Sequence, residues 1–165
     1  MSFIYAEKTY NPNIQKNDLK VFGDTKIELG NNAKANLTAV QYNLIKKYGI
    51  IKSTICCPEL CISFAGNEII YASELFNQLS NTKQFDVEDV VDLAYSIHKT
   101  AKFEDDIEFI ITYFSDKDND VHIDYVKEGE KHVDVSFAWI GSSIARKYFL
   151  NRRNYYQKTN PDSQQ

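Results

Sequence analysis

The stretch Lys52-Ser-Thr-Ile-Cys-Cys-Pro58-Glu-Leu-Cys-Ile-Ser-Phe-Ala-Gly66 decides how this chain folds. It contains two short apolar runs on either side of Pro58-Glu, a pattern that is typical of a β-hairpin. Beyond Gly66, apolar side chains recur three or four positions apart, at Ile69, Ala72, Leu75, Phe76 and Leu79. That spacing predicts a helix directly after the hairpin.

On both sides of this hairpin, the pattern separates strands from helices. Alternating or β-rich segments predict strands at residues 2–10 and about 19–29, and later at 107–114, 121–126 and 133–140. Helical spacing predicts helices at 37–48, 69–79 and 86–97, and one more after Gly141. Separate blocks of strands and helices favour a layered α+β fold over a parallel βαβ sheet. We expect one domain over residues 1–150 and a polar C-terminal tail over 151–165.

The composition excludes several classes of protein. The chain has 165 residues, of which 43% are apolar and 25% charged, so a folded domain with a core is expected. Its net charge is −4, and no basic stripe suggests nucleic-acid binding. No run reaches the roughly 18 apolar residues of a membrane span, and no signal peptide is visible. We therefore expect a cytoplasmic protein with neither a nucleic-acid nor a membrane partner.

The cysteines do not form a disulfide framework. Cys56, Cys57 and Cys61 are odd in number and lie close together in the sequence. A metal site would need a second pair of ligands, and the sequence offers none. These residues are therefore predicted to be buried thiols on strands, as free cysteines commonly are.

An acidic cluster imitates a calcium loop without completing it. Its carboxylates are spaced as in such a loop, at Asp116, Asp118, Asp120 and Asp124. However, Val121 stands in place of the loop's glycine and Lys127 in place of its closing glutamate, which favours a hairpin turn. The three histidines are too scattered in sequence to suggest another site, so we expect no metal and no cofactor.

Four residues could carry chemistry, and each also has a simpler explanation. Gly66 precedes a helix whose N–H groups can stabilise negative charge, although most such junctions are plain turns. Lys52 starts an apolar strand, where burial would lower its pKa and suit it to proton transfer; otherwise it is an exposed strand-end lysine. Asp24 could pair with Lys52 or lie in an exposed turn. Removal of the initiator methionine would give Ser2 a free α-amine with a pKa of about 8, which could act as base for its hydroxyl; serine at this position is also very common.

The hairpin and the following helix, Asn-Glu-Ile-Ile-Tyr-Ala-Ser-Glu-Leu-Phe-Asn-Gln-Leu, resemble the β subunits of proteasomes. They are also similar to the simpler bacterial proteasome-like peptidase that works with an unfoldase ATPase. In that family a catalytic lysine starts a strand, and the next strand ends in Ala-Gly before a long helix. The spacing from Lys52 to Gly66 and the position of Pro58 match this pattern. Phe137-Ala-Trp-Ile-Gly-Ser142 resembles the family's Ala-Ile-Gly-Ser-Gly junction, and the whole resemblance covers roughly residues 2–150.

The resemblance implies a four-layered α/β/β/α sandwich of the N-terminal-nucleophile hydrolases, with two stacked antiparallel sheets. Ser2 would replace the family's usual threonine as nucleophile, and Asp24 would hold Lys52. Lys52 would assist removal of the hydroxyl proton, the Gly66 N–H would form the oxyanion hole, and Ser142 would hydrogen-bond the N-terminal amine. The substrate would be a peptide or another amide. The implied partners are further copies of the chain in a ring and an unfoldase ATPase.

The chain also departs from this family. Ser2 and Asp24 are further apart than usual, and residues 37–48 look like an insertion. The family continues beyond the helix after Ser142 with elements that carry a supporting aspartate, so we expect either a fragment, truncated at its C-terminus, or an incomplete site. Three alternatives follow: an active hydrolase, an inactive assembly or binding protein with the same fold, or an α+β binding module whose likeness to the family is accidental.

Overall fold

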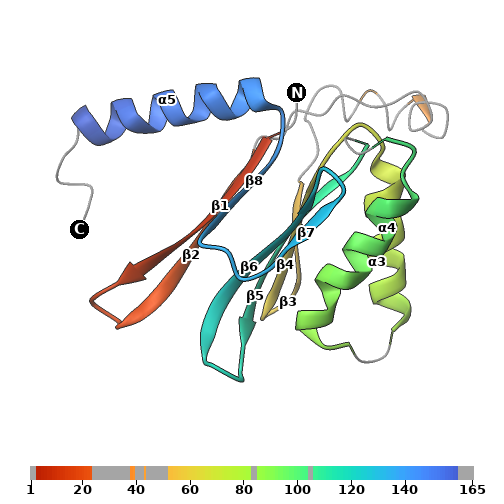
Figure 1. The fold of residues 1–165 in the computed structure, drawn as a ribbon, viewed down its shortest axis with the longest axis horizontal. Coiled ribbons are helices and arrows are strands. Elements are labelled where there is room, and N and C mark those ends of the chain that lie inside the picture. Colours follow the sequence, from red (N-terminus) through yellow and green to blue (C-terminus); the bar gives the residue numbers. More distant parts are fainter. Residues whose placement is uncertain are drawn as a thin grey trace.

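The computed structural model describes residues 3–23, 38–39, 43, 52–82, 85–103 and 106–159, with side chains as far as Asn151 (Figure 1). These residues form an α+β fold with two antiparallel sheets and three α-helices. The three-stranded sheet has the order β2-β1-β8, with β1 (Phe3–Asn11), β2 (Lys16–Gly23) and β8 (Phe137–Gly141). The five-stranded sheet runs in sequence order, with β3 (Ser53–Cys57), β4 (Leu60–Ala65), β5 (Glu108–Ser115), β6 (Asp120–Lys127) and β7 (Glu130–His132).

Alternation along the strands places two different apolar faces on the five-stranded sheet. One face meets the three-stranded sheet in a buried cluster: Ile4, Ala6, Ala138 and Ile140 from one sheet, Ala65, Ile110 and Ile123 from the other. The opposite face packs against α3 (Ile69–Asn81) and α4 (Val90–Thr100), which lie side by side on it (Figure 1). A one-turn 3₁₀ helix, η1 (Val87–Asp89), precedes α4 and is capped by the Asp86 side chain.

The last helix, α5 (Ser143–Thr159), contacts the three-stranded sheet on its other face. The Phe149 ring lies with its centroid 5.3 Å from that of Phe3, 5.5 Å from Tyr5 and 5.7 Å from Phe22. Phe3 and Tyr5 alternate along β1 with Ile4, which points into the core between the sheets. The two faces of β1 are therefore both covered, one by the other sheet and one by an aromatic cluster under α5.

The predicted hairpin at residues 52–66 is confirmed as β3 and β4, and the helix after it as α3. The strands predicted at 2–10, 107–114 and 121–126 correspond to β1, β5 and β6. The acidic residues between β5 and β6 form a hairpin turn, in which Asp118 Oδ1 accepts a hydrogen bond from the Asp120 N–H at 3.2 Å. Of the strand predicted at 19–29 and the helix predicted at 37–48, the structure describes only β2, up to Gly23, and residues 38, 39 and 43, of which the last two are helical.

The strand predicted at 133–140 is confirmed only in its second half, as β8, because residues 133–136 carry the chain from one sheet to the other. β7 ends at His132 in one sheet, and β8 begins at Phe137 in the other. Between them, Asp134 adopts a left-handed backbone with φ +48°, and the Val135 N–H donates to the Ile123 carbonyl at 2.9 Å. The alternation of apolar residues in the sequence does not reveal this crossing, because β8 begins only four residues after the end of β7.

The helix α5 continues to Thr159, so residues 151–159 of the polar C-terminal segment are helical. One further expectation is corrected. The three cysteines are free thiols on or beside β3 and β4, but Cys56 is exposed and the other two are half-buried, not buried. The reason is that β3 is an edge strand of its sheet, and the neighbouring Ile55 is itself 77% exposed. Partial burial of the Cys56 thiol raises its pKa, and the nearby thiols of Cys61 and Cys57 raise it further.

Candidate functional site

One end of the two sheets gathers segments that are far apart in sequence. The Phe64 N–H donates to the Lys52 carbonyl at 2.9 Å, so Lys52 lies beside the end of β4. Ala65, the residue after Phe64, pairs with Glu108 at the start of β5. The Glu108 carboxylate in turn accepts a hydrogen bond from the Gly141 N–H at 2.6 Å, across to the other sheet. These contacts bring the head of β3, the end of β4, the start of β5 and the end of β8 to one place.

The chain enters the three-stranded sheet at this same end. Phe3, the first residue of β1, pairs with Gly141, the last residue of β8. Ser142 follows immediately and precedes α5. Of the candidate residues, Ser2 and Asp24 lie outside the described residues, whereas Lys52, Gly66 and Ser142 lie at this end of the sheets.

Lys52 is buried, with only 3% of the residue exposed. The simpler alternative of an exposed strand-end lysine is therefore wrong. Lys52 is buried because it directly precedes β3, which pairs with β4. Its carbonyl binds Phe64, two residues before Gly66, where the chain is closely packed.

Gly66 is required by a close approach of two backbone segments. Its φ is +149°, and a Cβ at this position would lie 2.2 Å from the carbonyl oxygen of Asp106. That same oxygen accepts hydrogen bonds from the N–H groups of Asn67 and Glu68, both at 3.0 Å. The first N–H groups after the glycine thus bind the backbone at Asp106 and hold the two segments together.

Ser142 caps the last helix. Its carbonyl accepts from the Arg146 N–H at 3.0 Å, and its hydroxyl oxygen lies 3.5 Å from the Ala145 nitrogen, which donates to it. A serine in this position is a preferred N-cap because its side chain satisfies an N–H group of the first turn. The residue is half-buried, beside Gly141 and the start of the pocket described next.

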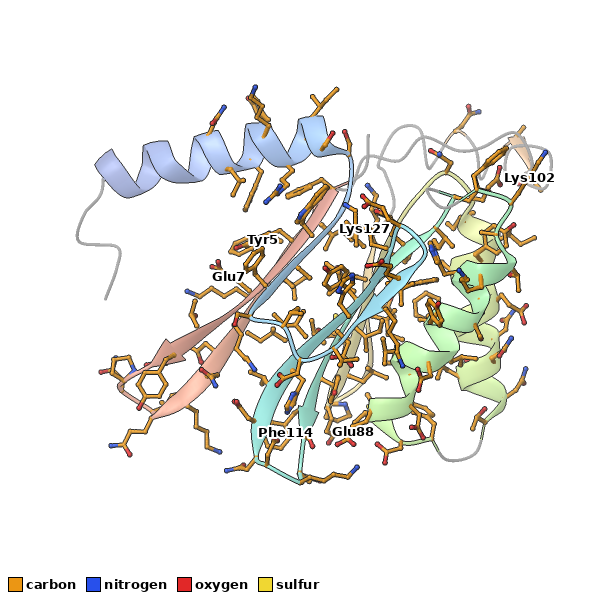
Figure 2. All side chains as sticks on the ribbon, in the orientation of Figure 1. Tyr5, Glu7, Glu88, Lys102, Phe114 and Lys127 are labelled. Carbon is orange, nitrogen blue, oxygen red and sulfur yellow. The ribbon has the colours of Figure 1, made fainter. Side chains whose placement is uncertain are left out.

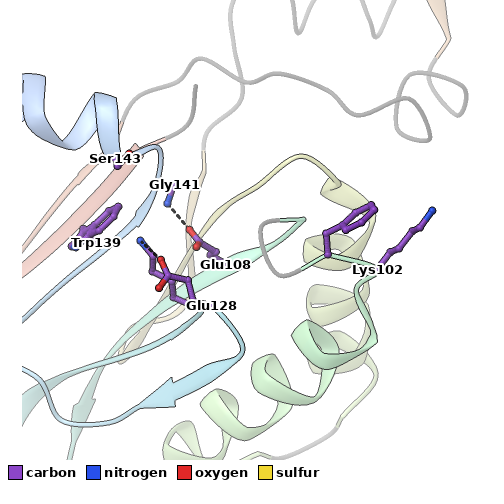
Figure 3. A pocket seen from close by; sticks show the side chains of 8 residues that line it. Lys102, Glu108, Glu128, Trp139, Gly141 and Ser143 are labelled. Atoms are coloured by element: carbon purple, nitrogen blue, oxygen red, sulfur yellow. Dashed lines mark hydrogen bonds and ion pairs between the residues drawn. The ribbon is translucent and has the colours of Figure 1, made fainter.

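A pocket of about 620 Å³ opens at this end of the sheets (Figure 3). Its walls include charged and aromatic side chains from both sheets and from the segment after α4: Lys102, Phe103, Glu108, Lys127, Glu128, Trp139, Gly141 and Ser143. Among these, Glu108 and Lys127 are buried, with 6% and 7% of each residue exposed. They lie on adjacent strands, one step beyond the pair Phe109 and Val126.

Sequence reasoning missed Glu108, Lys127 and Trp139 as pocket residues. In the sequence, Lys127 stands out only because it occupies the position of the closing glutamate of a calcium loop. A signal was present, because Glu108 starts a largely apolar strand and Lys127 directly follows the apolar Val126 at the end of the next strand. What the sequence did not show is that these two strand ends are neighbours and face β8.

The environment of Lys127 is unusual for a lysine. Its Nζ lies 2.9 Å from the centre of the Trp139 ring, and it has no hydrogen-bond partner among the described residues. Glu128 lies 3.7 Å away, which is an ion pair beyond hydrogen-bond distance. Burial lowers the pKa of Lys127, Arg146 lowers it further, and the carboxylates of Glu108 and Glu128 oppose that shift.

A second hollow, of about 440 Å³, lies at the opposite end of the five-stranded sheet, near Glu88 and Phe114 (Figure 2). Its polar groups satisfy one another. The Ser115 hydroxyl donates to Glu88 Oε1 at 2.9 Å, and the ammonium of Lys117 pairs with Glu88 and with Asp86. This hollow joins the β5–β6 turn to η1 and leaves no polar side chain unpaired among those named.

Two histidines have structural partners. His98 is buried; its Nδ1 lies 2.6 Å from the Ile107 carbonyl oxygen, and its Nε2 accepts from the Gly129 N–H at 2.9 Å. These bonds require a neutral ring with the proton on Nδ1. His122 lies between two carboxylates, with Nε2 2.9 Å from Asp118 and Nδ1 3.0 Å from Asp134.

Within the described part of the chain, no group of three or more His, Cys, Asp or Glu side chains is arranged to hold a metal ion. In the same residues, no helix is both long enough and apolar enough to span a membrane. No family model matches the sequence, and no curated protein is similar to it. The candidate site is therefore the end of the sheets where Lys52, Gly66, Glu108 and Gly141 meet.

Proposed function

We propose that this chain is an amide hydrolase that uses Ser2 as an N-terminal nucleophile, as its resemblance to proteasome β subunits implies. One observation carries the proposal: the start of β1 at Phe3, the buried Lys52, Gly66 and Ser142 all lie at one end of the two sheets. These residues come from four separate segments, and the proposed chemistry needs all four in one place.

The proposal includes the four-layered α/β/β/α sandwich. Three contacts support it: the two sheets share a buried apolar cluster, α3 and α4 pack on the far side of one sheet, and Phe149 of α5 packs on the far side of the other. An enzyme of this kind keeps its reacting groups at one end of the central layers, where strands terminate and backbone N–H groups become accessible.

In the proposed reaction, removal of the initiator methionine exposes the α-amine of Ser2. The Ser2 hydroxyl oxygen attacks the carbonyl carbon of an amide while the α-amine takes the hydroxyl proton. The Gly66 N–H stabilises the resulting oxyanion, and Lys52 lowers the barrier by its positive charge. The amide nitrogen then takes the proton and leaves as an amine, and water hydrolyses the acyl ester to release a carboxylic acid and restore the serine.

The test combines intact mass with hydrolysis of a fluorogenic peptide mixture. We expect a mass that lacks the initiator methionine, hydrolysis by the wild-type chain, and loss of hydrolysis in Ser2→Ala. Ser2→Thr should retain hydrolysis, because threonine offers the same hydroxyl and amine. Ser143→Ala is the matched control, since Ser143 is an exposed serine at the same end of the sheets. Retention of the initiator methionine, or equal hydrolysis by Ser2→Ala, would disprove the proposal.

A second candidate function is an assembly or binding protein that keeps the fold without catalysis. One observation favours it: Ile144 and Tyr148, one turn apart on α5, are 69% and 65% exposed. Apolar side chains on an exposed helix face commonly mark contacts with other chains. This function predicts no hydrolysis, and a mass in solution that is a multiple of one chain and falls to one chain in Ile144→Glu.

A further inference from the structure

We propose that the pocket around Lys127 and Trp139 binds the carboxylate of a ligand with an aromatic or aliphatic body. The inference goes beyond the proposed hydrolysis and depends only on the pocket. It therefore holds or fails whether or not Ser2 is a nucleophile.

The first step is the state of the Lys127 ammonium. Its side chain is nine-tenths buried, and its Nζ has no hydrogen-bond acceptor among the described residues, although an ammonium has three N–H donors. The nearest carboxylate oxygen, of Glu128 at 3.7 Å, belongs to a side chain that is 75% exposed. A buried charge without hydrogen bonds is costly, and an incoming acceptor would remove that cost.

The second step is the sign of the ligand charge. α5 begins at Ser143 in the pocket wall with no acidic residue in its first turn, so the positive end of its dipole faces this region. The guanidinium of Arg146, in the same turn, lies 4.6 Å from the centre of the Trp139 ring. Together with Lys127, these groups favour an anion.

The third step separates a carboxylate from a phosphate. The pocket already contains Glu108, which is held by the Gly141 N–H, and Glu128 at its rim. A doubly charged phosphate would experience more repulsion from these carboxylates than a singly charged carboxylate would. Trp139 and Phe103, which also line the pocket, provide apolar surface for the body of the ligand. The lining therefore suits an organic monocarboxylate.

Trp139 makes the proposal directly testable, because it is the single tryptophan of the chain. Its fluorescence reports on the pocket without interference from other tryptophans. We would titrate the wild-type protein with 3-phenylpropionate, with its uncharged counterpart 3-phenylpropionamide, and with inorganic phosphate. The expected result is a saturable change with the carboxylate and binding about ten- to hundredfold weaker with the amide, since a charge-assisted hydrogen bond is lost. Phosphate should also bind more weakly than the carboxylate.

Lys127→Met keeps the stem of the lysine and removes its charge, and it should weaken binding of 3-phenylpropionate by about ten- to hundredfold. Lys102→Met is the matched control, because Lys102 is an exposed lysine of the same pocket and should change binding by less than about fivefold. Equal binding of acid and amide by the wild-type protein, absence of a saturable response, or stronger binding of phosphate would overturn the proposal. So would unchanged binding by a folded Lys127→Met. The comparison of acid with amide needs no variant and remains decisive if Lys127→Met does not fold.

Discussion

The Gly141 N–H donates a hydrogen bond to Oε2 of Glu108 at 2.6 Å, and this bond joins the two sheets. Gly141 ends β8 in the three-stranded sheet, whereas Glu108 begins β5 in the five-stranded sheet. The Gly141 backbone has φ +88°, which a residue with a side chain rarely adopts. The bond therefore positions the end of β8, the wall of the pocket and the start of α5 relative to the other sheet.

Glu108→Ala should destabilise the protein, because it leaves the partly buried Gly141 N–H without its acceptor. We expect the free energy of unfolding to fall by about 1–3 kcal/mol in urea denaturation. Glu108→Gln should lose less, since its amide oxygen can still accept the bond. Glu128→Ala, which removes an exposed carboxylate from the same pocket, should change the free energy by no more than about 0.5 kcal/mol. Equal effects of the two alanine variants would contradict a structural role for the Glu108–Gly141 bond.

Gly66→Ala should be among the most damaging substitutions in the chain. The new Cβ would lie 2.2 Å from the Asp106 oxygen, and the backbone already has φ +149°. Overlap and backbone strain together are expected to cost about 2–6 kcal/mol, measured by thermal or urea denaturation.

Gly23→Ala is the control for Gly66→Ala, because a Cβ at Gly23 would lie 3.4 Å from Ile4 Cγ1, close to an ordinary contact. It should cost about 1 kcal/mol or less. A Gly66→Ala protein as stable as Gly23→Ala would show that the segments at Gly66 and Asp106 are not in contact in solution.

His98→Ala should remove a connection between α4, β5 and the β6–β7 turn. The ring donates to the Ile107 carbonyl and accepts from the Gly129 N–H, and both partners would lose their bond. We expect a loss of about 2–4 kcal/mol in the free energy of unfolding, from two unsatisfied backbone groups. His132→Ala is the comparison, since His132 is more exposed and mainly stacks on Tyr125. A smaller effect at His98 than at His132 would be inconsistent with this arrangement.

His122 should make stability depend on pH. Partial burial lowers its pKa, but hydrogen bonds and charge from Asp118 and Asp134 outweigh this and raise the pKa above its usual value. The same contacts lower the pKa of Asp118, and contacts with Lys8 and His122 lower that of Asp134. A histidine with a raised pKa in the folded state stabilises the protein fully below its unfolded pKa of about 6.5, and this contribution is lost as the pH rises through the folded value.

The carboxylates of Asp118 and Asp134 set the lower end of the pH range in which His122 stabilises the protein. Their contribution is present above their unfolded pKa of about 3.9 and is lost as the pH falls. The difference in free energy of unfolding between wild type and His122→Gln should therefore be largest between about pH 4 and 6.5 and should decrease toward alkaline pH. In a background of Asp118→Asn and Asp134→Asn, this pH dependence should disappear. A difference that stays constant from pH 5 to pH 9, by urea denaturation, would show that His122 does not titrate against these carboxylates.

Local patterns in the sequence determined the elements that depend on near neighbours along the chain. The apolar runs around Pro58 form β3 and β4, and the helical spacing after Gly66 forms α3, because alternation and the helical period act over a few residues. The same local reasoning placed Gly66 at the junction between a strand and a helix, although it could not identify Asp106 as the residue whose backbone lies against it.

Only the tertiary structure decided which strand ends meet. The crossing between His132 and Phe137 takes β8 into the other sheet, where it brings Trp139 to Lys127 and Gly141 to Glu108. No period in the sequence encodes these contacts, because they join residues that are 12 or more positions apart through the order of strands in two sheets. The burial of Lys127 and Glu108 follows from this order of strands. A charged residue at the end of a strand is buried only if another part of the chain packs against it.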